Sequence, residues 1–95
     1  MKTSRVLLDV GFERLRQEQL KAEGRFKHTC ADPEMNHVEC LAVLVEEVGE
    51  VARAALELGG LVSDKHRDKV ECELDLYKEL IQVAAVAVAW AERLS

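Results

Sequence analysis

Apolar residues recur every three to four positions along most of this chain, and the pattern predicts three helical segments. The first predicted helix begins between Ser4 and Val10 and ends near Glu23. Gly24 follows it as a residue that readily ends a helix in the left-handed conformation. Asp9 is an alternative N-cap, and a helix starting there would leave the residues before it extended.

The second predicted helix has two candidate starts. Asp32 and Pro33 offer an N-cap followed by proline at the first helical position, where the missing N–H costs nothing. Asn36 and Glu39 instead have the spacing of a capping box, in which two residues satisfy each other's backbone N–H groups. With either start, we expect the helix to end at the glycine pair 59–60.

The third predicted helix begins at Ser63 or Asp64 and can run to Leu94. About 31 residues at 1.5 Å each span about 47 Å, although a compact domain of this length has a radius of gyration of only roughly 12 Å. Its second half, residues 80–91, is apolar on nearly every side, and Gln82 is its one polar residue. Two further helices cannot cover this circumference, so we expect a homodimer or homotetramer.

Composition narrows the class of protein. The 95 residues are enough for a single domain, 1–95, with a thin core. The net charge is −5 and no basic cluster occurs, which argues against nucleic-acid binding and means that an anionic ligand needs a mediating cation. The longest apolar run is shorter than the roughly 20 residues of a membrane span. Three irregularly spaced cysteines and the lack of a signal-like start predict a cytoplasmic protein with free thiols.

Three glutamates of the second helix, Glu46, Glu47 and Glu50, fall within about 100° of its circumference. Glu47 borders the apolar face, where neighbouring carboxylates repel one another unless a cation compensates them. Mg²⁺ suits such a site, because it takes hard oxygen ligands and leaves positions for phosphate and water. Gly49 favours a binding site here. A glycine inside a helix lowers its stability by about 1 kcal/mol relative to alanine, which implies that another group comes close to the backbone. A solvated charge stripe is the alternative interpretation.

The third helix places Glu79 and Gln82 three residues apart on one face. A buried amide is costly without partners. Gln82 therefore either makes a hydrogen bond to another helix or supplies a neutral oxygen to a metal ion or substrate.

Two motifs carry a family resemblance. The stretch LAVLVEEVGEVARA at 41–54 resembles the EExxE helix of the MazG-like all-α NTP pyrophosphatases, and KELIQVAA at 78–85 resembles their ExxD motif. Segments 12–17 and 26–33 are similar to those before the acidic helix in phage-type and dCTP-pyrophosphatase-type members. The resemblance covers most of residues 12–92 and implies an all-α fold, with three-helix protomers forming a helical bundle by dimerisation or tetramerisation.

The resemblance also implies hydrolysis of a nucleoside triphosphate to a monophosphate and pyrophosphate, as nucleotide house-cleaning, with Mg²⁺ or alternatively Mn²⁺. Glu47, Glu50 and Glu79 would bind the metal, and Glu46 would be a further ligand or the base for the attacking water, so that Glu46 and Glu47 carry the catalysis. Gln82 stands where the family has Asp and offers only a neutral oxygen to the metal.

Cationic and aromatic side chains supply candidates for substrate binding, although each also fits a role on the surface or in the core. The phosphate-binding candidates are Arg14, Lys21, Arg53 and Lys78, and the base-stacking candidates are Phe26 and Trp90.

Other classes of protein fit parts of the pattern. A non-enzymatic oligomerisation or regulatory module would use the apolar third helix for assembly alone. A zinc site could draw on His28, Cys30, His37 and Cys40, whose spacing is not that of a familiar zinc finger. A di-iron bundle needs two Glu-x-x-His pairs, and the chain has one, formed by Glu34 and His37.

Overall fold

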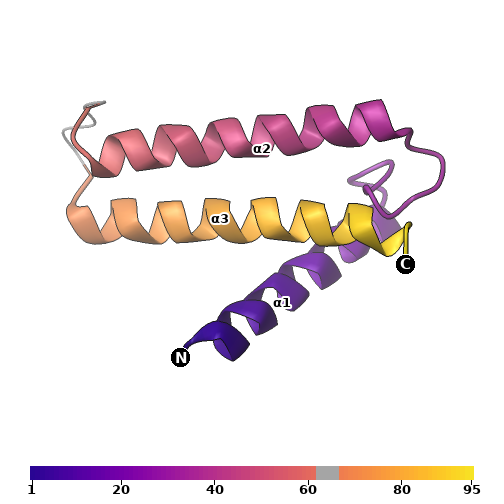
Figure 1. Cartoon of the computed structure of the whole chain (residues 1–95), viewed down its shortest axis with the longest axis horizontal. Coiled ribbons are helices and arrows are strands. Elements are labelled where there is room, and N and C mark those ends of the chain that lie inside the picture. Colours follow the sequence, from indigo (N-terminus) through magenta and orange to yellow (C-terminus); the bar gives the residue numbers. More distant parts are fainter. Residues whose placement is uncertain (62–66) are drawn as a thin grey trace.

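The computed structural model of this chain describes residues 1–61 and 67–95, which form three α-helices and their connections (Figure 1). Helix α1 spans Thr3–Ala22, α2 spans His37–Leu58 and α3 spans Lys69–Glu92. The described residues contain no strand, so the predicted all-α fold is confirmed. None of their helices is long and apolar enough to cross a membrane.

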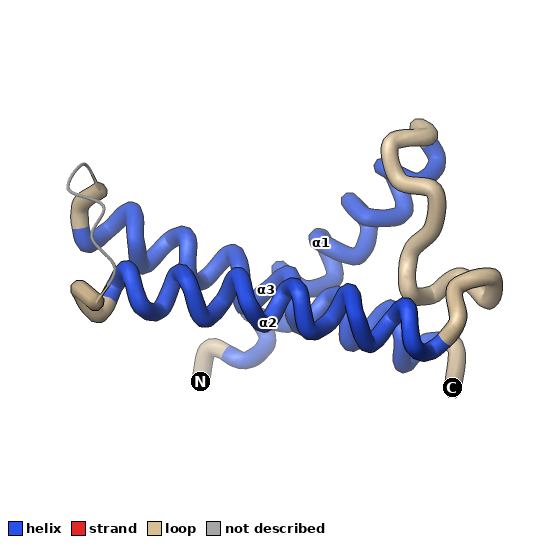
Figure 2. The backbone as a smooth tube through the Cα atoms, turned by 90° about the horizontal axis from the view of Figure 1, so that it is seen from above, coloured by secondary structure: helices blue, strands red, loops and turns tan. Residues whose placement is uncertain are grey.

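The three helices form an open arrangement rather than a closed bundle. Helices α2 and α3 run antiparallel side by side, and α1 crosses α3 at an angle (Figures 1 and 2). In the described part of the chain, α1 and α2 each pack against α3 but not against each other. The radius of gyration is accordingly 14.7 Å, larger than the value of roughly 12 Å for a compact chain of this length.

The ends of α1 follow local sequence signals. Gly24 has a φ of +77° one residue after the C-cap, as expected for a left-handed helix end. The helix begins at Thr3, so the alternative start at Asp9 is wrong. Asp9 instead accepts a hydrogen bond from the Tyr77 hydroxyl and ties α1 to α3.

A capping box starts α2. The Asn36 side chain accepts the Glu39 N–H at 2.8 Å, and the Glu39 carboxylate accepts the Asn36 N–H at 3.1 Å. The alternative start at Asp32 is wrong, because that carboxylate caps a local turn through the Glu34 N–H at 3.0 Å. Gly60, with a φ of +76°, follows the end of α2 as expected.

Helix α3 starts later than the pattern predicts. Asp68 is its N-cap and accepts the Glu71 N–H at 2.8 Å. The predicted starts at Ser63 and Asp64 lie outside the described residues. With 24 residues, α3 is about 36 Å long at 1.5 Å per residue. It therefore fits within the 42 Å longest dimension of the molecule without a break.

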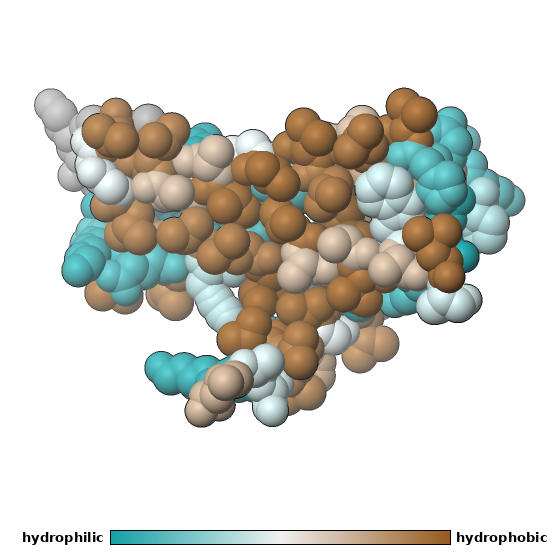
Figure 3. Space-filling model, viewed as in Figure 1, coloured by the Kyte–Doolittle hydropathy of each residue, from teal (hydrophilic) through white to brown (hydrophobic). Residues whose placement is uncertain are grey.

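The core is thin and the apolar surface is large. The residues that are 1% exposed or less are small ones: Cys40, Ala54, Ala85 and Ala89. Figure 3 shows hydrophobic residues spread over α2 and α3 on the face seen in Figure 1. The accessible surface is 6796 Å², compared with about 5,500 Å² expected for a folded monomer of 10.7 kDa. The chain thus exposes about 1,300 Å² more than a typical monomer of its mass.

Part of this surface is a regular stripe on the outside of α2. We name Val38, Leu41, Val45 and Val48 the α2 stripe, and these side chains are 75, 50, 61 and 49% exposed. Their alternating spacing of three and four residues is that of a helix-pairing seam.

Candidate functional site

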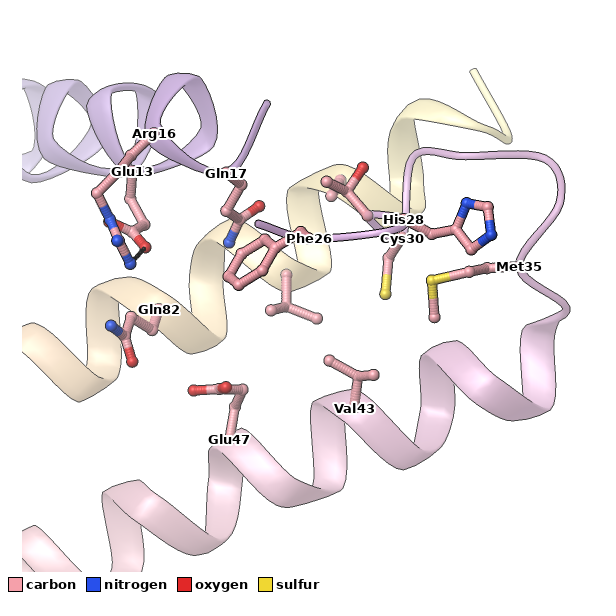
Figure 4. A pocket seen from close by; sticks show the side chains of 13 residues that line it. Glu13, Arg16, Gln17, Phe26, His28, Cys30, Met35, Val43, Glu47 and Gln82 are labelled. Atoms are coloured by element: carbon pink, nitrogen blue, oxygen red, sulfur yellow. Dashed lines mark hydrogen bonds and ion pairs between the residues drawn. The ribbon is translucent and has the colours of Figure 1, made fainter. Parts of the chain in front are cut away.

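A cavity of about 330 Å³ is enclosed by residues of α1, α2, α3 and the loop that joins α1 to α2. Figure 4 shows the side chains that line it. They are Glu13, Arg16 and Gln17 of α1; Phe26, His28, Thr29, Cys30 and Met35 of the loop; Val43 and Glu47 of α2; and Gln82, Val86 and Ala89 of α3. One end, near the loop, is largely apolar, and the other end carries carboxylates and amides.

Two carboxylates, one from each of α2 and α3, lie close together beside this cleft. Glu79 is 9% exposed, and Glu47 lines the cleft itself. Each has a buried Oε2 atom with no hydrogen-bond partner among the described residues. Burial raises the pKa of Glu47, and the negative charge of Glu79 raises it further. A proton or a cation would compensate these buried carboxylate oxygens.

Gln82 lies one helical turn after Glu79 and lines the same cleft (Figure 4). Gln82 is half-buried, and its amide makes no hydrogen bond to another helix among the described residues. The predicted helix-to-helix hydrogen bond is therefore not seen there. A neutral oxygen donor facing the cleft is the interpretation that fits its position.

The other two glutamates of the predicted trio, Glu46 and Glu50, do not line the cleft. Glu50 forms an ion pair with Arg53 at 3.1 Å, and Glu46 is exposed. In the described parts of the chain, one group of three potential metal ligands has its ligand atoms within 4.8 Å of one another, and it does not include Glu47. That group is His28, Asp32 and Glu34. Its central carboxylate, Asp32, is already paired with a lysine ammonium at 2.9 Å.

The predicted zinc ligands do not form a group among the described residues. The ring of His37 stacks on Trp90 at a centroid distance of 5.9 Å, and its Nδ1 accepts the indole N–H at 2.8 Å. Cys30 and Cys40 are buried next to each other, and burial raises the pKa of Cys30 to about 12. Such a thiol is a poor nucleophile at neutral pH.

None of the four predicted phosphate-binding cations lines the cleft. Arg14 is buried and bound by Glu92 and Glu18, each at 3.0 Å. Lys21 is paired with Asp32. Arg53 is held by acids of its own helix, and Lys78 is an exposed residue that lines a separate shallow hollow.

Of the two aromatic candidates, Phe26 lines the cleft and Trp90 does not. Among the described residues nothing approaches Gly49 closely, because a Cβ added there would meet no atom within 4 Å; the expected neighbouring helix is therefore not part of this described chain.

Sequence reasoning missed the α1 wall of the cleft. One face of this helix carries three polar residues at helical spacing, namely Glu13, Arg16 and Gln17. This spacing is the sequence feature that could have predicted the wall. Glu13 and Arg16 form a bidentate pair, with both N–O distances at 2.9 Å.

No family model, curated protein or solved structure matches this chain. The resemblance to MazG-like enzymes consequently stays a prediction, and the functional argument depends on the geometry of the cleft.

Proposed function

We propose that this chain is a Mg²⁺-dependent nucleoside triphosphate pyrophosphohydrolase, which releases a nucleoside monophosphate and pyrophosphate. The observation that carries the proposal is the pair of Glu47 and Glu79, whose buried Oε2 atoms have no hydrogen-bond partner in residues 1–61 and 67–95. Leaving buried carboxylates unpaired destabilises a fold. Such an arrangement is typical of a site that a cation completes.

A hard divalent ion fits the donor set, which is made of carboxylate oxygens and one amide oxygen. Glu47, Glu79 and Gln82 would hold it, and Glu50 would join them after its side chain leaves Arg53. A bound Mg²⁺ would supply charge neutralisation for phosphate oxygens and activate water. Of the two catalytic candidates, Glu47 is favoured over Glu46, because Glu47 lines the cleft and Glu46 is exposed.

The shape of the cleft supports a nucleotide as the ligand. Its volume of about 330 Å³ is in the range of small-molecule sites. Phe26 and Met35 give the loop end an apolar surface suited to a nucleobase, and the carboxylate end suits metal-bound phosphates. We propose that the base occupies the loop end and the phosphates the carboxylate end, so that the α-phosphorus lies toward the metal ligands. The physiological role would be nucleotide house-cleaning in the cytoplasm.

The test is a screen of NTPs and dNTPs for pyrophosphate release with MgCl₂, MnCl₂ or EDTA. We expect metal-dependent turnover of at least one nucleotide, and its loss in Glu47→Gln. Glu73→Gln is the matched control, since Glu73 is an exposed glutamate on α3 outside the cleft. A complete panel without metal-dependent release would refute the enzyme proposal.

A second copy of the chain is the proposed partner. The excess surface of about 1,300 Å² is the area that one partner contributes to a stable homodimer. The α2 stripe has the heptad spacing of paired helices. We expect light scattering to give a dimer or tetramer for the wild type, and Val45→Glu to lower the mass to that of one chain. A wild-type monomer at micromolar concentration would refute this assembly.

The exposed apolar surface also favours one alternative, a non-enzymatic oligomerisation or regulatory module. In that case the carboxylate pair would be incidental to function. The two proposals differ in a thermal melt, because Mg²⁺ raises the midpoint of a protein that binds it in the native state. A midpoint that does not respond to Mg²⁺, together with inactivity, would favour the module.

A further inference from the structure

Arg16 differs from the other arginines that form ion pairs within the described residues. It is the one Lys or Arg among the residues that line the cleft, and Figure 4 shows it on the α1 wall with Gln82 below it. Arg14, Arg53 and Arg67 are each held by two or more acidic side chains. Arg16 is held by Glu13 alone and is 52% exposed.

The geometry of this pair leaves half of the guanidinium free. Glu13 accepts from Nε and from Nη2, and therefore occupies one edge of the fork. An arginine has five N–H donors. Three remain, and they make no other hydrogen bond to the described residues. The Glu13 side chain is only 14% exposed, and its two hydrogen bonds hold the Arg16 guanidinium in one orientation.

A polyanionic ligand in this cleft would need a positive charge on the α1 wall. Glu13 and Glu47 line the cleft from its α1 and α2 walls, so each of these two walls carries a carboxylate. A polyphosphate entering the cleft would meet these charges, and a metal at Glu47 and Glu79 would neutralise only the α2–α3 side. A planar guanidinium on the opposite wall matches phosphate oxygens in geometry and charge.

We propose that Arg16 binds the polyphosphate of the substrate from the α1 side, and that Glu13 is a positioning residue that orients its guanidinium. This inference rests on the proposed function, because it assigns a role within the same cleft. The phosphates would then lie between two cations, the metal ion at Glu47 and Glu79 and the guanidinium of Arg16.

The experiment measures binding of inorganic triphosphate by calorimetry in excess MgCl₂, which avoids the unknown base preference. The proteins are the full-length wild type, Arg16→Gln, Arg16→Lys and Glu13→Gln, with Arg25→Gln as the control. Arg25 is exposed and outside the cleft, and its substitution changes the net charge by the same amount. We expect Arg16→Gln to weaken binding at least about tenfold, as for the loss of charge-assisted hydrogen bonds.

The remaining variants separate charge from geometry. Arg16→Lys should recover part of the affinity, because lysine restores the charge without the fork. Glu13→Gln should weaken binding less than Arg16→Gln does, and Arg25→Gln should change it less than about twofold. Thermal midpoints near that of the wild type would exclude unfolding as the cause, and Arg16→Lys serves as the test variant if Arg16→Gln does not fold.

The possible results distinguish the two proposals. Equal triphosphate affinity in the wild type and Arg16→Gln overturns the role of Arg16, whether or not the wild type turns over nucleotides. Arg16-dependent binding without turnover of any nucleotide supports Arg16 and refutes the enzyme. Failure of the wild type to bind triphosphate overturns the role of Arg16, and the nucleotide screen then decides the enzyme proposal separately.

Discussion

Substituting Glu47 by Gln should make the metal-free protein more stable. Glu47 and Glu79 each leave one buried carboxylate oxygen without a partner in the described structure, and their charges repel. A buried polar atom without a partner costs about 1–3 kcal/mol. A glutamine at position 47 removes one charge and can donate an N–H to the remaining carboxylate. We therefore expect a gain of about 1–2 kcal/mol in the free energy of unfolding.

This gain is large enough to measure by thermal unfolding. For a domain of this size, 1 kcal/mol shifts the midpoint by about 4–8 °C. The expected rise in EDTA is thus about 4–16 °C. In MgCl₂ the order should reverse, because a ligand at one hundred times its Kd stabilises the wild type by about 2.7 kcal/mol and the variant has lost a metal ligand. Circular dichroism of both proteins in EDTA and in MgCl₂ gives all four midpoints.

Two results would refute this reasoning. A Glu47→Gln protein that melts below the wild type in EDTA would mean that Glu47 has a stabilising partner in the folded state. A Mg²⁺ shift that survives the substitution would place the ion elsewhere, and the group of His28, Asp32 and Glu34 would then be the next candidate. Glu73→Gln should match the wild type in both buffers, because that side chain is exposed.

Three further predictions concern pH and stability. Since burial raises the pKa of Glu47, its carboxyl in the folded protein holds a proton at a pH where that of the unfolded chain does not. In EDTA, the contribution of Glu47 to the free energy of unfolding should therefore be greatest in acid and decline as the pH rises above about 4.3. Glu47→Gln should abolish this decline in thermal melts recorded over a series of pH values. Asn36→Ala should destabilise the protein by about 1 kcal/mol in urea unfolding, because the capping box is lost. Arg14→Gln should cost about 1–2 kcal/mol in the same assay, because Glu18 and Glu92 lose their partner, yet leave triphosphate affinity within about twofold; a selective loss of affinity would return Arg14 to the substrate site.

Helix boundaries were readable where their determinants are local. The capping box of Asn36 and the positive-φ glycines at 24 and 60 involve residues within one turn of the helix end. The choice between Asp32 and Asn36 was open in the sequence because Asp32 has the chemistry of an N-cap. Its carboxylate is used by a turn and by Lys21, and a lysine eleven positions earlier is not visible as a partner in a local pattern.

Side chains of the cleft were readable from α2 and α3 but not from α1. Glu47 stands out because it borders the apolar face of α2, and Gln82 because it is the one polar residue in the apolar run of α3. The roles of Arg14 and Arg16 depend on how α1 crosses α3, which no periodicity encodes. Arg14 meets Glu92, 78 positions away, and so becomes a structural ion pair. Arg16, two residues later on another side of α1, faces the cleft instead.

The two faces of α2 allow assembly and chemistry to be tested separately. At about 100° per residue, Glu47 lies roughly 140° around the helix from the centre of the α2 stripe. The stripe is exposed, and Glu47 faces the cleft. Val45→Glu should therefore disrupt the dimer without altering the carboxylate pair or the Arg16 wall. If the resulting monomer binds triphosphate as the wild type does, one chain forms the whole site. If affinity falls in proportion to dissociation, the second copy contributes to the cleft, and the open side between α1 and α2 is where it would do so.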